Sequence, residues 1–259
     1  MEFETLAHEI DGVHTVVKAI GSGPAVIALH GAATIEGYDW ARGLADRFRV
    51  YLPFHPGFGE SGEAPHIAGM QDMIVHNLRL VGALGLDRPH LVGHSMGGWM
   101  AAEMAIVAGE RFGRLVLNAA AGLNHPDHQG ADLAAIPPQE FPTYLAHNVE
   151  VAARYFPGGS ECPSVEAFVA AREKEGPALG NILKVHGMGH PNLGRWLSRI
   201  PNETLIVWGD KDRMLPPSQA PIWRERIPNA RTLIVKDVGH FAMQEDPRSV
   251  TAIGDFLAH

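Results

Sequence analysis

Short apolar runs rich in β-branched residues alternate with longer segments of helical periodicity along most of the chain. Short runs of this kind, bounded by glycine and proline turns, are typical of strands that helices cover on both faces. The predicted strands are 13–20, 25–29, 48–52, 89–92, 115–117, 204–207 and 232–235, and the predicted helices are 38–47, 70–84, 99–108 and 247–257. The alternation predicts an α/β fold with a mostly parallel sheet between two helical layers.

The pattern changes between residues 122 and 200, where strand-like runs are missing and prolines separate helix-compatible pieces such as 144–155 and 165–173. We therefore expect a core domain formed by 1–121 and 201–259 and an inserted helical cap formed by 122–200. Ligands of open α/β sheets bind at the carboxyl ends of the strands, so the insertion is placed to act as a lid. Its aromatic residues are expected either to line an apolar pocket or to attach the cap to the core: Phe141, Tyr144, Tyr155, Phe156, Phe168 and Trp196.

Residues 93–97 read Gly-His-Ser-Met-Gly and lie between an apolar strand and a small-residue helix. In this context the pattern G-x-S-x-G predicts a nucleophile elbow, a sharp turn that exposes the serine hydroxyl. Gly93 and Gly97 remove side chains that would collide at such a turn. With 29 glycines in the chain a bare match is weak. The strand–turn–helix context therefore carries the prediction that Ser95 is the nucleophile.

Serine is a poor nucleophile unless a base removes its proton, and histidine is the natural base because its pKa lies near about 6.5. Of the 15 histidines, His240 directly follows the last predicted strand. Asp212 follows the strand before it, and the chain order serine, aspartate, histidine is the order found at such elbows. We expect Asp212 to orient His240 and stabilise its charged form. Asp210 is the alternative acid, with stabilisation of the turn as its other role.

An oxyanion hole needs two backbone N–H groups aimed at the forming alkoxide. We expect one from Met96, the residue after the nucleophile, and the other from Ala32 in the loop after strand 25–29. No cofactor is required, and no metal site is expected. His186 and His190 have a spacing that suits zinc on a helix, but two glycines lie between them and no third ligand is evident.

Five motifs extend from residue 30 to residue 247: HGAA, HPGFGES, GHSMGG, WGDKDRMLPP and GHFAMQEDP. Together they resemble the α/β-hydrolase fold superfamily, in its compact capped branch with a serine nucleophile. The resemblance implies an eight-stranded, mostly parallel sheet flanked by helices. It also implies a triad of Ser95, Asp212 and His240 and a helical cap at about 122–200.

Two positions depart from that family pattern. Many relatives carry an acidic residue where this chain has Phe54, and because that residue is structural there we expect only a local effect. Relatives that cleave carbon–carbon bonds in aromatic ring-fission products often carry Trp after the catalytic histidine. This chain has Phe241 at that position, which weakens that assignment.

We expect acyl transfer in two steps, with a small or medium carboxylic ester as substrate and an acyl-enzyme intermediate. The same triad serves carbon–carbon bond hydrolysis, lactone opening or perhydrolysis, and these activities stay open. A non-catalytic ligand-binding member of the fold is the alternative from another class.

Composition narrows the partners of the protein. The net charge is −8 and no basic run is present, which argues against a nucleic-acid partner. The single cysteine, Cys162, cannot form an internal disulfide. The acidic start of the chain does not match a signal peptide, and no apolar run is long enough to span a membrane. We therefore expect a cytoplasmic enzyme with a small-molecule substrate, and a homodimer is left open.

Overall fold

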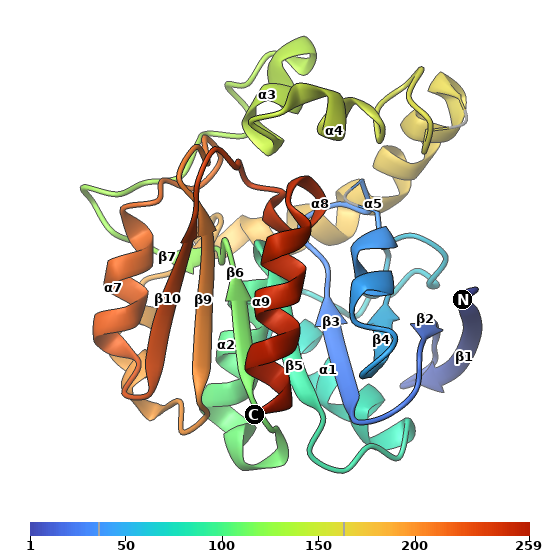
Figure 1. The fold of residues 1–259 in the computed structure, drawn as a ribbon. Coiled ribbons are helices and arrows are strands. Elements are labelled where there is room, and N and C mark those ends of the chain that lie inside the picture. Colours follow the sequence, from blue (N-terminus) through green and yellow to red (C-terminus); the bar gives the residue numbers. More distant parts are fainter. Residues whose placement is uncertain (36, 163) are drawn as a thin grey trace.

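The computed structural model describes residues 1–35, 37–162 and 164–259. Its main sheet has eight strands in the order β1-β2-β4-β3-β5-β6-β9-β10 (Figure 1). Strand β2 pairs antiparallel with β1 and β4, and all other neighbours are parallel. The strands are β1 (Glu4–Ile10), β2 (Val13–Ile20), β3 (Ala25–Leu29), β4 (Arg49–Pro53), β5 (His90–His94), β6 (Leu115–Asn118), β9 (Thr204–Gly209) and β10 (Ala230–Val235). The predicted mostly parallel α/β sheet is confirmed.

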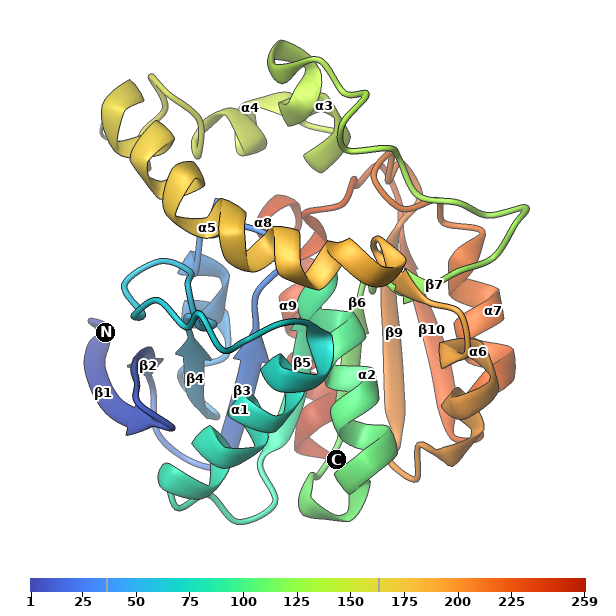
Figure 2. The ribbon, with the colours of Figure 1, turned by 180° about the vertical axis from the view of Figure 1, so that it is seen from behind.

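Two apolar layers form because alternate residues of each strand point to opposite faces. Ile27 and Leu29 of β3 join the layer under α1 and α2, whereas Val26 and Ala28 join the layer under η1 and α9. Figures 1 and 2 show these two sides of the sheet. The helices of the core are η1 (Asp39–Gly43), α1 (Met70–Ala83), α2 (Met96–Ala108), η2 (Gly109–Arg111), α7 (Gln219–Arg226), α8 (Ala242–Glu245) and α9 (Pro247–Ala258).

Several core elements differ from the sequence predictions, and the short helices η2 and α8 are among those that were not predicted. The expected helix at 38–47 is only the short 3₁₀ helix η1, which ends at Gly43. Glycine is a weak helix former, and Gly43 packs against Val250 of α9. Strand β1 and helix α7 were not predicted. Strand β1 is mostly exposed, and its polar sequence has no clear apolar run.

Phe54, the first of the two departures from the family pattern, is buried and packs edge-on against Tyr38, with the ring centroids 5.5 Å apart.

The 122–200 segment, which we call the cap segment, places α3, α4 and α5 over the carboxyl ends of the central strands (Figures 1 and 2). Its elements are β7 (Gly122–Leu123), η3 (Pro138–Glu140), α3 (Phe141–Leu145), α4 (Val149–Ala153), α5 (Val165–His186), β8 (Gly189–His190), α6 (Leu193–Trp196) and η4 (Leu197–Arg199). The expected absence of strands was wrong, because β7 and β8 pair in parallel. That the segment is a domain separate from the core stays a prediction.

Two predicted helices of the cap segment have different bounds in the structure. The expected helix at 144–155 is interrupted between α3 and α4, where the Asn148 side chain accepts the N–H of Glu150 and starts a new helix. Helix α5 extends well beyond the expected 165–173 and continues through Pro177. A proline inside a helix removes one backbone hydrogen bond, which costs about 3 kcal/mol. Contacts between α5 and the core, described below, offset part of that cost.

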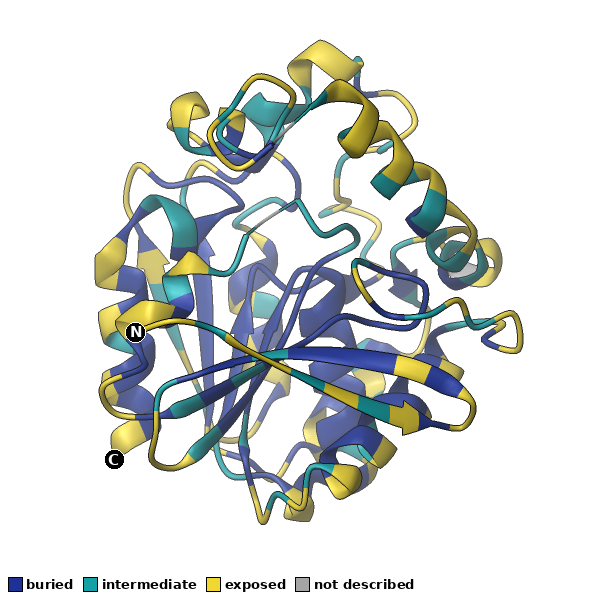
Figure 3. Cartoon of the chain, turned by 90° about the vertical axis from the view of Figure 1, so that its right-hand side faces the viewer, coloured by how far each residue is buried: buried dark blue, intermediate teal, exposed yellow. Residues whose placement is uncertain are grey.

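Buried residues fill the space between the sheet and its helices, and exposed residues dominate the outer side of α5 (Figure 3). Within the described residues, no helix combines the length and the apolar character that a membrane crossing requires. The loops at the carboxyl ends of β5, β9 and β10 carry Ser95, Asp212 and His240, and all three of these residues are buried.

Candidate active site

Ser95 lies at the turn between β5 and α2 with φ 52° and ψ −118°. A positive φ is strained for a residue that carries a side chain. The neighbouring glycines make the turn possible, because a Cβ on Gly97 would lie 2.2 Å from the carbonyl oxygen of Leu29. A Cβ on Gly93 would lie 2.3 Å from the carbonyl oxygen of Gly97. The strand, the turn and the helix therefore occur in the predicted order. Only glycine fits at the positions two residues before and two residues after Ser95.

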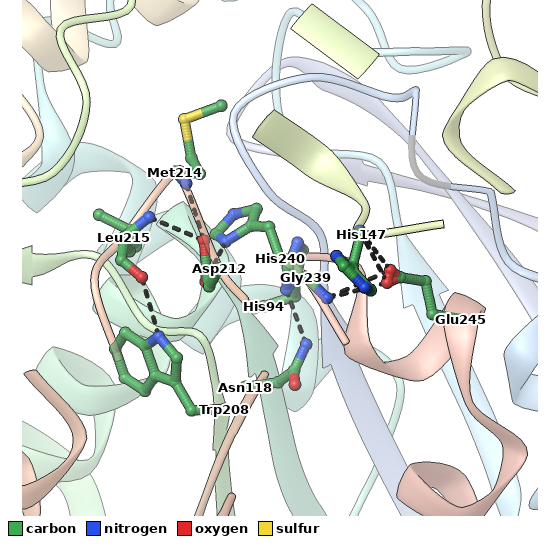
Figure 4. Close-up of polar contacts among 10 residues, drawn as sticks. All are labelled: His94, Asn118, His147, Trp208, Asp212, Met214, Leu215, Gly239, His240 and Glu245. Atoms are coloured by element: carbon green, nitrogen blue, oxygen red, sulfur yellow. Dashed lines mark hydrogen bonds and ion pairs between the residues drawn. The ribbon is translucent and has the colours of Figure 1, made fainter. Parts of the chain in front are cut away.

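Asp212 and His240 meet directly at the ends of β9 and β10. The Nδ1 atom of His240 lies 2.9 Å from Oδ2 of Asp212 (Figure 4). The other carboxylate oxygen accepts the backbone N–H groups of Met214 at 2.8 Å and Leu215 at 2.9 Å. Both side chains are buried. The carboxylate is therefore fixed on one side by its own loop and faces the imidazole with the other oxygen.

Asp210, the alternative acid, points elsewhere. One of its carboxylate oxygens accepts the backbone N–H of Asp237 at 2.7 Å, and the other lies 3.4 Å from the ammonium group of Lys211. This arrangement matches the turn-stabilising role that the sequence suggested. Of the two acids, only Asp212 contacts His240.

His94, the residue before the serine, was not predicted to take part in the site. Its ring centroid lies 4.7 Å from that of His240, and its Nδ1 atom lies 2.8 Å from the side-chain amide of Asn118. Burial, which disfavours the charged form, holds the pKa of His94 well below its ordinary value. A neutral ring therefore packs against the imidazole of His240. The position of His94 inside the elbow motif was the available signal.

The structure places the Ser95 loop beside His240 through this ring contact. Among the described residues, the Ser95 hydroxyl makes no hydrogen bond to a protein group, so its contact with His240 stays a prediction. Nucleophile–base hydrogen bonds are often long in ligand-free enzymes and shorten when substrate is bound. Asp212 and His240 thus share a direct hydrogen bond. Ser95 is placed near them by the ring contact between His94 and His240.

The two expected oxyanion donors lie on adjacent segments. Met96 is the first residue of α2, so its N–H has no partner within the helix. Gly97 brings this helix end against the last residue of β3, after which the loop with half-buried Ala32 begins. The structure therefore brings the two segments together. The aim of both N–H groups at one oxyanion stays a prediction.

His30 holds the start of that loop. Its Nδ1 atom lies 2.8 Å from the carbonyl oxygen of Gly31, and its Nε2 atom accepts the backbone N–H of His55 at 3.1 Å. These partners require a neutral ring with the proton on Nδ1. Burial supports this state because it lowers the pKa of His30 to about 4. A neutral, buried imidazole therefore fixes the backbone one residue before Ala32.

A cavity of about 550 Å³ lies beside this loop, between the N-terminal strands, the 34–42 loop and the cap segment. Thr34 and Ile35, just after the loop with Ala32, line it, and so does Tyr155, whose ring lies 6.2 Å from the ring of Phe241. In the described part of the chain, Ser95 is not among the lining residues. The cavity is therefore next to the loops of the predicted triad, with Tyr155 between it and the histidine loop.

The aromatic residues of the cap segment divide between the two expected roles. Tyr155 and Phe168 line the cavity, and Phe156 packs against Phe168 at 5.5 Å. Tyr144 instead lies under the guanidinium of Arg213 of the core at 4.2 Å, and Trp196 stacks on His190 within the cap segment at 4.6 Å. Pocket lining and attachment to the core therefore both occur.

Within the described residues, no three His, Cys, Asp or Glu side chains cluster in a way that could hold a metal ion. The expectation that His186 and His190 hold no metal is not tested, because the side chain of His186 lies outside the described part of the structure.

The sequence profile described as the alpha/beta hydrolase family matches residues 26–253. The chain belongs to this family. The match covers both halves of the core and the cap segment between them. The family assignment agrees with the elbow at Ser95 and with the eight-stranded sheet, and it makes the protein a member of a hydrolase family.

Curated relatives align over nearly the whole chain. The 2-hydroxy-6-oxo-2,4-heptadienoate hydrolase of Pseudomonas putida is 28% identical, and the alignment covers 98% of this chain and 93% of that protein. The 2-hydroxy-6-oxo-6-phenylhexa-2,4-dienoate hydrolase of Comamonas testosteroni is 30% identical, over 92% of this chain and 88% of that protein. Both relatives are hydrolases by name.

Solved structures share the fold. A meta-cleavage product hydrolase from Pseudomonas fluorescens superposes with a TM-score of 0.81 at 22% identity, covering 98% of this chain and 97% of that one. A thermophilic esterase from Thermogutta terrifontis superposes with a TM-score of 0.77 at 23% identity, covering 98% of both chains. The same fold therefore occurs in an esterase and in a meta-cleavage product hydrolase.

Proposed function

We propose that this protein is a serine hydrolase that cleaves a small or medium carboxylic ester through an acyl-enzyme intermediate, with Ser95 as nucleophile. The observation that carries the proposal is the buried hydrogen bond between His240 and Asp212, located beside the strained elbow of Ser95. A buried imidazole with a fixed carboxylate partner, placed next to a serine in forced geometry, fits general-base activation of that serine.

The hydrogen bond with Asp212 sets the role of each imidazole nitrogen. When the N–H at Nδ1 donates a hydrogen bond to the carboxylate, Nε2 keeps a free lone pair that takes the proton of the Ser95 hydroxyl. The serine oxygen then forms a bond to the carbonyl carbon of the ester. The carbonyl oxygen becomes an alkoxide, which the N–H groups of Met96 and Ala32 stabilise.

Breakdown of this intermediate completes the first half of the reaction. The bond between the carbonyl carbon and the ester oxygen breaks, and His240 gives its proton to the leaving alcohol. Water then attacks the acyl-enzyme while His240 takes one of its protons, the bond to the serine oxygen breaks, and the carboxylic acid is released. Every proton is returned, so the protein ends in its starting state without a cofactor.

Hydrolysis of a carbon–carbon bond in a vinylogous diketone is a second candidate. The observation that favours it is the set of curated relatives named as 2-hydroxy-6-oxo-dienoate hydrolases, which align over more than nine-tenths of the chain. This reaction asks more of the site, because the leaving group is a carbanion that must be delocalised in the substrate and protonated on carbon. Phe241, in place of the Trp frequent in such relatives, argues for the ester.

Substitution of Ser95 by Ala tests the proposal. We expect p-nitrophenyl acetate turnover to fall by at least about 10³-fold, because loss of the nucleophile leaves only the oxyanion donors and substrate binding. Circular dichroism and thermal unfolding should show an intact fold. Ser198→Ala, which removes an exposed hydroxyl in the cap segment, is the matched control and should keep full turnover. Undiminished turnover in Ser95→Ala rejects the proposal.

Two further measurements separate the alternatives. A fluorophosphonate probe should label wild-type protein at Ser95 and leave Ser95→Ala unlabelled, whereas an unlabelled wild type supports a ligand-binding protein without catalysis. A panel of p-nitrophenyl esters, lactones and 2-hydroxy-6-oxo-dienoates, compared by kcat/KM, then assigns the bond. The ester proposal requires the highest kcat/KM for an ester.

A further inference from the structure

The loop that carries His240 is joined to the cap segment by hydrogen bonds on both sides of the histidine. The N–H of Gly239 donates to the Glu245 carboxylate at 2.8 and 3.1 Å, and the N–H of Phe241 donates to the carbonyl oxygen of Leu145 at 2.8 Å. The same carboxylate accepts the N–H of His147 at 2.7 and 3.0 Å (Figure 4). One carboxylate thus links the histidine loop to the start of α4.

We propose that Glu245 is a positioning residue, which holds the His240 loop against residues 145–148 of the cap segment and so fixes the imidazole for proton transfer. The inference rests on the proposed function, in which His240 is the base. Glu245 itself lies on α8, the short helix that follows His240. Its carboxylate reaches back to the residue before the histidine and across to the cap segment.

The packing around Gly239 shows why this contact needs a hydrogen-bond acceptor. A Cβ on Gly239 would lie 2.6 Å from the backbone nitrogen of His147, so the two backbones are in direct contact and no side chain fits between them. A glycine without an anchor has more backbone freedom than any other residue. The hydrogen bond to Glu245 removes that freedom at the position next to the proposed catalytic base.

Three different partners therefore fix the ring of His240 and the backbone on each side of it. Asp212 holds the ring at Nδ1, Glu245 holds the backbone before the histidine, and Leu145 holds the backbone after it. A proton-transfer group must stay within hydrogen-bond reach of the atom it serves, and a shift of about 1 Å in such a group costs about 100-fold in rate. Loss of one of the two backbone anchors allows a shift of that size.

The environment of Glu245 fits a role directed at backbone amides. Within the described residues, no Lys or Arg side chain forms an ion pair with Glu245. Burial raises the pKa of Glu245, and the N–H groups of Gly239, His147 and Asn148 oppose that rise by stabilising the charged form. Each of its two oxygens lies within 3.1 Å of both the Gly239 and the His147 nitrogen. One carbonyl oxygen therefore reaches both N–H groups, but the amide NH2 of a glutamine would face the same two donors.

This geometry defines an informative set of variants. Glu245→Gln keeps one suitably placed oxygen, Glu245→Ala removes the acceptor, and Glu245→Asp shortens the side chain by one methylene so that it cannot reach both amides. Glu150→Ala is the matched control, because Glu150 is an exposed acid of the cap segment whose carboxylate makes no hydrogen bond among the described contacts.

The first readout is steady-state kinetics with p-nitrophenyl acetate, corrected for folded fraction by circular dichroism. We expect Glu245→Ala to lower kcat by about 10- to 100-fold while KM changes far less, since the base is misplaced in the chemical step. Glu245→Gln should restore part of kcat, because it keeps one acceptor oxygen but turns its NH2 donor toward the same two N–H groups, and Glu150→Ala should match wild type. A merely structural residue would change the folded fraction and leave kcat of the folded protein intact. That result, or an equal loss in the Gln and Ala variants, overturns the proposal.

The second readout does not depend on catalysis. Hydrogen exchange measured by mass spectrometry should show faster exchange in Glu245→Ala for peptides that contain the amides of Gly239 and His147, with no change in Glu150→Ala. If wild-type protein does not hydrolyse esters, the proposed function fails and this exchange still decides whether Glu245 holds the loop. Unchanged exchange overturns the link even where Ser95 chemistry is established. If the Ala variant does not fold, Glu245→Asp takes its place in both measurements with the same expected losses.

Discussion

The loops that carry the proposed triad and the cap segment above them are held in place by different kinds of contact. Around Ser95 backbone segments pack directly against one another. A Cβ on Gly97, for example, would lie only 2.2 Å from the carbonyl oxygen of Leu29. Helix α5 of the cap segment is held by polar side chains and by apolar packing of Ile182, which is buried in the core cluster. Lys174 donates to the carbonyl oxygens of Gly59 at 2.6 Å and Ser61 at 2.8 Å.

A buried acid completes the attachment of α5. Glu175 is only 3% exposed, forms an ion pair with Arg172 at 2.9 Å, and accepts the N–H of Gly59 at 3.2 Å and that of Thr34 at 3.3 Å. It also accepts the hydroxyl of Thr34. These few hydrogen bonds attach the helix to two loops of the core without close packing of backbones.

The two kinds of contact fit different requirements of the two regions. Groups that exchange protons need fixed positions, and close packing supplies them because an interior at this density does not deform gradually. A segment that borders a cavity needs a surface that can change without loss of the core, and attachment by side-chain hydrogen bonds allows this. We therefore expect large effects from substitutions at the loops and smaller effects from substitutions at α5.

The largest effect is expected at the acid of the triad. Asp212→Asn keeps the shape of the side chain but presents an amide in place of the carboxylate, which favours the wrong imidazole tautomer. We expect kcat for p-nitrophenyl acetate to fall by about 10⁴-fold. The measurement is steady-state kinetics on folded protein.

The neighbouring acid provides the control for that substitution. Asp210→Asn alters a side chain that bonds to Asp237 and Lys211, away from His240, and turnover should stay unchanged. A greater loss in Asp210→Asn than in Asp212→Asn would reverse the assignment of the two acids.

The next effect tests the packing of the elbow. Gly97→Ala places a Cβ within 2.5 Å of the carbonyl oxygens of both Leu29 and His30, and backbone atoms have little room to move away. We expect the free energy of unfolding to fall by about 3 kcal/mol, with a loss of turnover in the remaining folded protein. Urea denaturation followed by circular dichroism measures the change.

Gly180 in α5 gives the matched control, since a Cβ there would meet no atom within 4 Å. Gly180→Ala should raise stability by about 0.5–1 kcal/mol, because alanine loses less backbone freedom in a helix. If both substitutions have the same effect on stability, the two regions do not differ in packing as described.

The smallest effect is expected at the attachment of α5. Glu175→Ala leaves the N–H groups of Thr34 and Gly59 without their acceptor and removes the partner of Arg172. We expect a loss of about 1–3 kcal/mol in the free energy of unfolding, and a rise in KM with little change in kcat. Thermal unfolding and ester kinetics measure both.

Glu173→Ala is the control on the same helix, because Glu173 is exposed. It should leave stability and KM unchanged, and Glu175→Gln should lose less than Glu175→Ala because it keeps one acceptor oxygen. A fall in kcat for Glu175→Ala as large as that for Asp212→Asn would contradict the division between the loops and the cap segment.

Local chain chemistry was sufficient to predict the elbow and every strand of the main sheet except β1. Short apolar runs identified the strands that are buried on both faces, and the spacing of Gly93, Ser95 and Gly97 identified a turn that those glycines alone permit. The sequence also ranked Asp212 above Asp210, and the hydrogen bond to His240 agrees with that ranking. The geometry of a strand or a turn depends mainly on residues that are neighbours in the sequence. The order of residues is therefore enough to predict it.

The tertiary structure decided how the cap segment is built and what it contacts. The bounds of α3, α4 and α5, the pairing of β7 with β8, and the roles suggested for Glu175 and Glu245 had no signal in the order of residues. Glu175 meets Thr34 across 141 positions of sequence, and Glu245 meets His147 across 98. An acidic side chain on a helix looks the same in the sequence whether it faces water or a backbone amide, because only the folded arrangement of distant segments supplies its partner.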